Sequence, residues 1–174
     1  GRSVRLVEDL LAPVGAWPEA TDEHALIRYR QRLSISHLGL ADSEIYDRIA
    51  ELDENVQGVC GRGFSPTPTL AAGPLAKTLG LGEIDLWLKV DADNVAGSHK
   101  ARHLAGVMLY LQTLRAHGRL SRGRELAIAS CGNAALAAAT LARATDWPIR
   151  VFVPQTVDPH VLARLHELGA QVVV

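Results

Sequence analysis

The sequence predicts an α/β fold built on an open parallel sheet. Strand-like and helix-like segments alternate from residue 84 onward, an order that places helices in the βαβ crossovers between parallel strands. Turns with glycine stand where a strand gives way to a helix, at residues 97–100 and 130–133. In such sheets ligands bind beyond the carboxyl ends of the strands, where turns meet helix N-termini. We therefore expect both turns to lie at a ligand site.

The composition is that of a globular chain with small partners. The 174 residues are 48% hydrophobic and 21% charged, enough apolar material for one core or two small lobes. Eighteen basic and nineteen acidic side chains give a formal net charge of −1, which argues against nucleic acid or an anionic membrane as a partner. No apolar run approaches the roughly 20 residues that cross a bilayer. Cys60 and Cys131 form no CxxC pair, so a cytoplasmic protein with reduced thiols is expected.

The first third of the chain predicts helices followed by a loop. Residues 22–56 show helical spacing in two segments, and Asp42 or Ser43 is expected to cap the second. The apolar positions are Ile27, Leu33 and Ile35 in the first segment and Ile45, Ile49, Leu52 and Val56 in the second. Four glycines and three prolines in residues 58–74 predict an extended loop there.

The remainder predicts alternating strands and helices. Strands are expected at residues 84–90, 125–130, 149–154 and 171–174, and helices at 99–117, 134–145 and 159–168. In the first helix the expected buried stripe is Leu104, Val107, Met108, Leu111 and Leu114. Gly118 should end that helix, and Asp158 with Pro159 should begin the last one. Because the final run has the pattern of a buried strand just begun, we expect the polypeptide to continue beyond Val174.

The turn at residues 130–134 is the first candidate site. A strand that ends at Ser130, followed by Cys131, Gly132 and Asn133 and then a helix, exposes the unpaired amides of the first helical turn. These donors and the positive end of the helix suit a carboxylate or a phosphate. A plain turn with Ser130 or Asn133 as helix cap has the same residue pattern, so this motif alone leaves both interpretations open.

Lys100 is the second candidate. A cation in the first turn of a helix opposes the helix dipole by roughly 0.3–1 kcal/mol, so local stability does not explain this lysine. The same positive end favours the neutral amine, which is the nucleophile needed for a Schiff base. A solvent-exposed lysine without a chemical role is the alternative.

Other reactive residues are less informative. His99 and His103 are four residues apart, a spacing that places two imidazoles on one helical face. Since no third ligand is evident, we predict no metal site. Cys131 would be a thiol nucleophile at a helix N-terminus, but no base accompanies it, and its small size already explains its place in a tight turn.

Together the two motifs resemble the fold-type II pyridoxal phosphate enzymes, the tryptophan synthase β-like group that includes threonine synthase and the serine/threonine dehydratases. GSHKAR (97–102) is similar to that group's cofactor-lysine segment, and SCGNAALAAATLA (130–142) to its substrate-carboxylate loop and following helix. SPTPTLAAGPLAKTLG (65–80) resembles its upstream T-P-L segment. The likeness runs from about Phe64 to Val174.

The resemblance implies roles for particular residues. Lys100 would hold pyridoxal 5'-phosphate as a Schiff base and move the substrate's α-proton. The substrate carboxylate would be held by Ser130, Cys131, Gly132, Asn133 and Ala134. Asn133 would also reach the cofactor's phenolic oxygen, and His99 would lie beside the cofactor. His99 stands where many dehydratases and threonine synthases have Phe, whereas tryptophan synthase β chains have His.

The resemblance also implies an activity and an organisation. We expect a lyase that carries out α,β-elimination on serine or threonine. The alternatives are threonine synthase-like β,γ-replacement and a non-catalytic relative that binds an amino acid or a partner. Residues 1–63 would pack on the larger lobe, residues 64–98 would begin that lobe, and residues 99–174 would form the smaller α/β lobe. A homodimer is expected. Residues 1–174 alone should turn over little, because the group's glycine-rich phosphate loop normally follows later.

Overall fold

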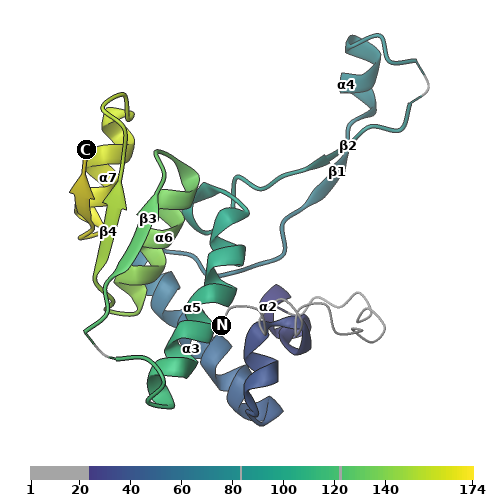
Figure 1. Ribbon diagram of the computed structural model, residues 1–174. Helices are drawn as coiled ribbons and strands as arrows, with labels where there is room; N and C mark the ends of the chain where they lie inside the picture. The colour runs from purple at the N-terminus through teal and green to yellow at the C-terminus, as the bar shows by residue number, and fades with distance from the viewer. Residues whose placement is uncertain (1–23, 83, 122) are drawn as a thin grey trace, which may run out of the picture.

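The computed structural model describes residues 24–82, 84–121 and 123–174. A body of helices and a parallel sheet carries a two-stranded arm that projects from it (Figure 1). The sheet consists of β3 (Leu126–Ala129), β4 (Ile149–Phe152) and β5 (Gln171–Val173), side by side in that order. Helices α6 (Asn133–Ala144) and α7 (Pro159–Glu167) connect the strands. The predicted α/β alternation is therefore confirmed for residues 126–173.

The N-terminal helices differ from the prediction. The first predicted segment, of which residues 22 and 23 lie outside the described residues, is split into α2 (Ala25–Arg28) and two 3₁₀ turns, η1 (Arg30–Arg32) and η2 (Ser34–Leu38). The Arg30 guanidinium donates to the Ile27 carbonyl at 2.9 Å, a side-chain bond that competes with helical pairing. This interruption depends on a side-chain contact that the apolar spacing does not encode.

Helix α3 (Asp42–Cys60) begins where predicted, but its predicted cap is wrong. Ala41 occupies the cap position, and its N–H donates to the Glu44 carboxylate at 2.9 Å. Asp42 instead forms a salt bridge with Arg30, 2.8 Å from its Nε. Asp42 thus takes part in a tertiary contact with Arg30, and Glu44 in the first turn accepts from the Ala41 N–H.

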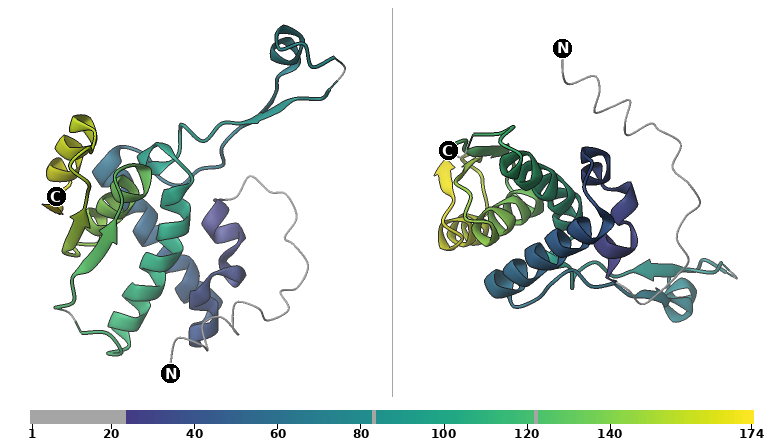
Figure 2. Two further views of the ribbon diagram at one scale, coloured as in Figure 1. Left: turned by 45° about the horizontal axis from the view of Figure 1, so that its top comes forward. Right: turned by 90° about the horizontal axis from the view of Figure 1, so that it is seen from below.

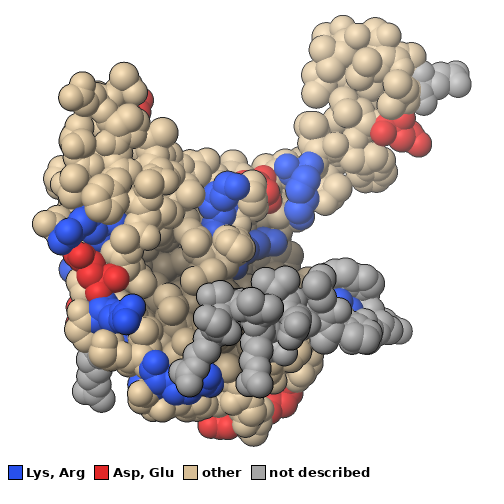
Figure 3. Space-filling view, in the orientation of Figure 1, with Lys and Arg blue, Asp and Glu red and all other residues tan. Residues whose placement is uncertain are grey.

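The arm corrects the prediction for residues 84–90. That segment does not join the parallel sheet: β2 (Trp87–Lys89) pairs antiparallel with β1 (Thr69–Ala71), and α4 (Gly73–Thr78) lies between them. Both strands are exposed throughout. The views in Figures 1 and 2 agree that the arm extends away from the body, and Figure 3 shows few charged side chains on the viewed face of its outer part. The predicted loop is confined to residues 62–68.

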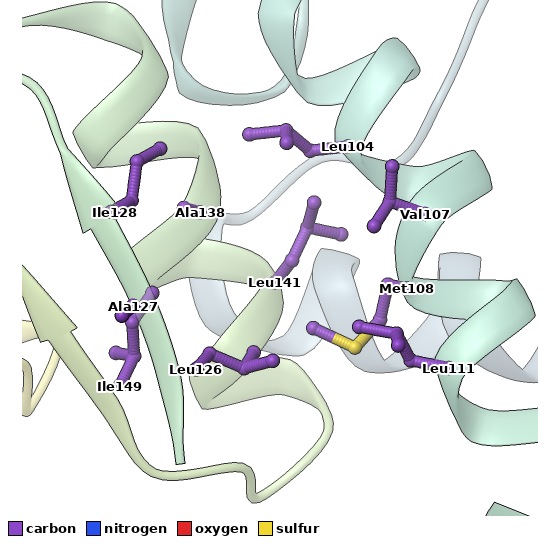
Figure 4. Close-up of a pocket in the computed structure, with 10 residues that line it drawn as sticks. All are labelled: Leu104, Val107, Met108, Leu111, Leu126, Ala127, Ile128, Ala138, Leu141 and Ile149. Atoms are coloured by element: carbon purple, nitrogen blue, oxygen red, sulfur yellow. The ribbon is translucent and has the colours of Figure 1, made fainter. Parts of the chain in front are cut away.

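Helix α5 (Lys100–Ala116) buries one residue of the predicted stripe, Met108, together with a face that the stripe did not include. Ala101, Ala105 and Leu109 are fully buried in the core shared with α3, whereas Val107 is 42% exposed. Part of the predicted stripe lines an apolar cavity of about 220 Å³ between α5, α6 and β3 (Figure 4). The lining is Leu104, Val107, Met108, Leu111, Leu126, Ala127, Ile128, Ala138, Leu141 and Ile149. None of the predicted site residues belongs to it.

Helix α6 is buried on two sides. Ala135 and Ala139 belong to the core between the sheet and α7, and Ala137 and Leu141 belong to the core shared with α3 and α5. Because alanine adds only a methyl group, the neighbouring elements approach the helix backbone closely. The alanine-rich segment recognised in the sequence is thus the central helix of the body.

Two predicted helix boundaries are confirmed. Gly118 has φ 66° and follows the end of α5. At the start of α7, Asp158 accepts from the His160 N–H at 2.7 Å, and Pro159 is the first helical residue. Within the described part of the chain, no helix combines the length and hydropathy needed to cross a bilayer.

A half-buried carboxylate, that of Asp53, ties α2 and α3 to the loop before the arm. The His24 Nδ1 accepts from the Leu26 N–H at 3.2 Å, which leaves Nε2 to carry the ring hydrogen, and Nε2 lies 3.2 Å from the Asp53 carboxylate. Asp53 also accepts from the Phe64 N–H. A Cβ at Gly63 would lie 2.5 Å from this carboxylate, so the close approach requires glycine there.

We expect Asp53→Asn to lower the free energy of unfolding by about 1–2 kcal/mol at pH 7. Burial alone would raise the pKa of Asp53, but the contacts with His24 and the Phe64 N–H outweigh it and hold the pKa below 3.8. Since the folded pKa lies below the unfolded one, this stabilisation exists above pH 3.8 and is lost as the pH falls through the folded pKa. In denaturant titrations the difference between the two proteins should therefore shrink as the pH is lowered from 7 to 2.5.

Asp47→Asn on the exposed side of α3 is the matched control, expected to change stability by less than about 0.5 kcal/mol. A difference between Asp53→Asn and the parent that persists unchanged at pH 2.5 would contradict the assignment.

Candidate functional site

Lys100 lies at the end of a tightly folded loop, which we call the lysine loop (residues 94–99). The short turn η3 (Val95–Gly97) precedes the lysine, and Val95 is fully buried. Ala96 and Gly97 have φ 55° and 71°. A non-glycine residue in this left-handed region costs about 1–2 kcal/mol, so surrounding contacts must hold Ala96 there. The backbone that leads to Lys100 is therefore held in one unusual path.

The Ser98 side chain bonds to the first turn of α5. Its side-chain oxygen accepts from the Lys100 N–H at 3.3 Å, which satisfies one of the free donors of the first turn. Ser98 is buried, whereas His99 and Lys100 are exposed. His99 and Lys100 are the two predicted site residues of this loop. The His99 Nδ1 atom lies 3.8 Å from the Asp91 carboxylate. Within the described residues, the Lys100 amine has no acidic or hydrogen-bonding partner, and the side chain is exposed.

A hydrogen-bonded network lies beneath the lysine loop. Asp91 accepts from the Thr67 hydroxyl at 3.2 Å and from the Asn94 amide at 3.0 Å. The Asn94 oxygen accepts from Arg102 Nε at 2.9 Å, and Arg102 also donates to the Ser65 carbonyl. We call these five residues the Asp91 network. This network was not predicted from the sequence, although the polar cluster DADN (91–94) just before the lysine motif was a signal for it.

The position of Lys100 in the fold corrects one expectation. Lys100 does not follow a strand of the parallel sheet, because β2 belongs to the arm. It nevertheless lies near the second turn, since η3 contacts α6. In Figure 1 both α5 and α6 begin at the upper end of the body. The two turns therefore share one end of the body through helix packing, without sharing a sheet edge.

The second turn leaves a helix N-terminus open. Gly132 occupies the cap position of α6, and no side chain caps the helix, so the interpretation of Ser130 or Asn133 as a cap is wrong. The Ser130 N–H is used by the sheet, where it donates to the Phe152 carbonyl at 3.0 Å. The first helical bond is from Leu136 N–H to the Gly132 carbonyl at 3.1 Å.

The open amides of α6 suit a small anion. Among the described residues, no acceptor lies on the N–H groups of Asn133, Ala134 and Ala135. These donors and the helix dipole together favour a carboxylate or phosphate. Asn133 and Cys131 are exposed beside them. The arrangement pairs a free amine with an anion-binding helix end.

No metal centre is evident from the side chains. Over the residues that the structure describes, no three His, Cys, Asp or Glu side chains converge on one point. Cys60 and Cys131 are both free thiols, and Cys60 Sγ contacts the Val56 carbonyl at 3.2 Å.

Comparison with known proteins identifies the family. A model of the pyridoxal-phosphate dependent enzyme family matches residues 61–174. Two curated proteins called serine dehydratase-like, from Rattus norvegicus and Mus musculus, are 31% and 32% identical to this chain over 106 residues. These alignments cover 61% of this chain and 29% of each relative, so the chain spans less than a third of the length of those proteins.

Solved structures have the same fold at low sequence identity. Maize serine racemase matches with a TM-score of 0.52 over 72% of this chain and 35% of its own. A pyridoxal 5'-phosphate-dependent aspartate racemase gives 0.53 over 72% and 36%, and O-ureido-L-serine synthase gives 0.51 over 68% and 34%. Each is 20% identical to this chain, which shows the fold alone. The predicted tryptophan synthase β-like class is thereby confirmed.

We expect the two cysteines to differ in reactivity. Cys131 is exposed at the start of α6, whereas Cys60 is partly buried and contacts carbonyl oxygens. Iodoacetamide should therefore alkylate Cys131 at least about tenfold faster than Cys60 in the native protein, because access limits thiol reactions. Mass spectrometry of the two peptides over time measures both rates. In denaturant the rates should become equal, and a faster Cys60 in the native protein would contradict this description of the turn.

Proposed function

Because this chain belongs to the pyridoxal-phosphate dependent enzyme family, we propose that Lys100 is its cofactor lysine and that the α6 turn binds the substrate carboxylate. The observation that carries the proposal is the pairing of an unpartnered amine at the start of α5 with an uncapped helix N-terminus at the same end of the body. The family implies pyridoxal 5'-phosphate as the cofactor. Its substrates would be small amino acids.

The described residues fit this cofactor in two respects. Lys100 supplies an exposed amine, the group that must bond the cofactor's aldehyde. The free amides of residues 133–135 supply donors for the carboxylate of an amino acid. We propose that Ser130, Cys131, Gly132, Asn133 and Ala134 form this carboxylate site. Asn133 would also donate to the cofactor's phenolic oxygen, and His99 would lie beside the ring.

The proposed reaction is elimination from a hydroxy amino acid. The cofactor supplies an electron sink for the negative charge that develops at the substrate's α-carbon. Lys100 would hold the cofactor through its amine, and the same amine would take the α-proton of the bound amino acid. The β-hydroxyl then leaves with a proton as water, and hydrolysis of the product gives ammonia and a 2-oxoacid.

The names of the relatives support this assignment and define its competitor. The rat and mouse relatives are called serine dehydratase-like, in agreement with elimination. Serine and aspartate racemases have the same fold, and a racemase would return the α-proton to the other face instead of expelling the hydroxyl group. Threonine synthase-like replacement is the further alternative. All these reactions begin with the same proton removal by Lys100.

The arm supports the proposed division into lobes. Residues 64–98 would begin the larger lobe and residues 99–174 would form the smaller one. The expectation that residues 1–63 pack on the larger lobe is not met by α3, which packs on α5 and α6. The arm extends from the body and exposes several large apolar side chains, namely Leu70, Leu75, Leu79, Leu81, Ile84, Trp87 and Leu88. A lobe boundary at the lysine loop agrees with this shape. A homodimer and a cytoplasmic location are also proposed.

Lys100→Ala should abolish covalent capture of the cofactor by the complete polypeptide that carries this sequence. The parent, incubated with pyridoxal 5'-phosphate and reduced with borohydride, should gain one pyridoxyl group on Lys100, and the variant none at that position. Mass spectrometry of the peptides measures this directly. Lys77→Ala, on the exposed α4, is the matched control and should leave capture unchanged. Capture that survives in Lys100→Ala would overturn the proposal.

Product analysis separates the reactions. With L-serine or L-threonine the complete polypeptide should release ammonia and 2-oxoacid in equal amounts, since elimination produces one of each. Formation of D-serine without ammonia would assign it to the racemases. Phosphate release from phosphohomoserine would favour threonine synthase-like replacement.

A further inference from the structure

Asn94 and Arg102 hold the backbone on both sides of Lys100. Asn94 begins the lysine loop, and Arg102 lies two residues beyond Lys100 on α5. Their side chains meet, with Arg102 Nε donating to Asn94 Oδ1 at 2.9 Å. The loop that presents the lysine is therefore closed across its base by a side-chain hydrogen bond.

Each of these residues is anchored to another part of the chain. Asn94 is 3% exposed and donates to Asp91, which also accepts from the Thr67 hydroxyl. Arg102 donates a further hydrogen bond to the Ser65 carbonyl. Asn94 thus bonds directly to the segment after β2 and to the first turn of α5, and both of these bond in turn to the segment before β1. A shift of any of them would be transmitted to the lysine loop.

The lysine loop contains backbone conformations that the Asn94–Arg102 hydrogen bond can help to hold. Ala96 and Gly97 have positive φ, and the bond from the Lys100 N–H to Ser98 follows directly from that path. Arginine suits this place because its planar guanidinium presents several donors in fixed directions. One side chain can therefore bind the Asn94 oxygen and the Ser65 carbonyl together.

We propose that Asn94 and Arg102 are positioning residues that hold the first turn of α5, and with it the Lys100 amine, in the orientation that the cofactor's aldehyde requires. Both act through the backbone of the lysine loop. This inference rests on the proposed role of Lys100, because positioning has a chemical consequence only if the lysine bonds the cofactor.

The test compares covalent capture of pyridoxal 5'-phosphate at Lys100 and Lys77 in one sample of the complete polypeptide. After borohydride reduction, mass spectrometry gives the ratio of the two pyridoxyl-lysines, with Lys77 in the arm as the internal reference. In the parent we expect Lys100 to dominate. Asn94→Ala should lower the ratio about tenfold, because a displaced reacting group loses rate steeply. Arg102→Lys keeps the charge but lacks the planar fork, and should lower it as well.

Arg115→Gln is the matched control on the same helix. Arg115 lies near the other end of α5, where its guanidinium carbon is 3.3 Å from the centre of the Trp147 ring. Its loss should alter stability but leave the capture ratio within about twofold of the parent, because distant sites act independently. Amide hydrogen exchange gives a readout without cofactor. In Asn94→Ala it should accelerate in residues 95–102 and stay unchanged in residues 133–144.

The outcomes separate the two proposals. A capture ratio within about twofold of the parent in both Asn94→Ala and Arg102→Lys overturns the positioning role. So does faster exchange throughout the body, which indicates general destabilisation. If the parent itself shows no preference for Lys100 over Lys77, the proposed function fails. If Asn94→Ala does not fold, Arg102→Lys decides, since that side chain is only partly buried.

Discussion

The body depends on how closely other elements can approach α6. Ala135, Ala137 and Ala139 are all fully buried, although they belong to two different cores. Their methyl groups let the sheet and α7 pack on one side while α3 and α5 pack on the other. A larger side chain on either face would move α5 away from the sheet. The separation of α5 from α6, and with it that of the two turns, therefore depends on the small side chains of α6.

The N-termini of α5 and α6 differ in whether their first N–H groups have a hydrogen-bond acceptor. At α5, Ser98 accepts from the first turn and the Asp91 network fixes the loop before it. At α6, where Gly132 is the cap residue, the first amides have no acceptor among the described residues. The N-terminus of α5 thus has a hydrogen-bonded first turn and exposes the Lys100 side chain. The N-terminus of α6 exposes backbone N–H groups instead. This division agrees with an amine that must be aimed and an anion that must be received.

Local chemistry explains what could be predicted from the sequence. Asp158, Pro159 and Gly118 act within one helical turn, so their roles follow from neighbouring residues, as does the alternation that gives β3, β4 and β5. The lysine and glycine motifs were likewise local patterns, and the family comparison supports the fold and cofactor that they suggested.

Long-range contacts explain what could not be predicted. The alternation of apolar and polar residues in a strand does not determine which strand it pairs with. Residues 87–89 pair with residues 69–71 and do not join the parallel sheet. The buried face of α5 depends on α3 and η2, since the apolar spacing permits either face. The Asp91 network joins residues from Ser65 to Arg102, a separation over which sequence spacing gives no guidance. The candidate site residues were thus named from local motifs in the sequence, whereas the Asp91 network beside Lys100 was not.

The arm and the body each carry a tryptophan, and the two differ in exposure to solvent. Trp87 on β2 is 61% exposed, whereas Trp147 is 3% exposed and its indole N–H donates to the Arg124 carbonyl at 2.7 Å. In a Trp17→Phe background, long-wavelength emission would come from the solvated indole of the arm and short-wavelength emission from the buried indole of the body. A single emission spectrum would then follow the covering of the arm and the packing of the body as separate events.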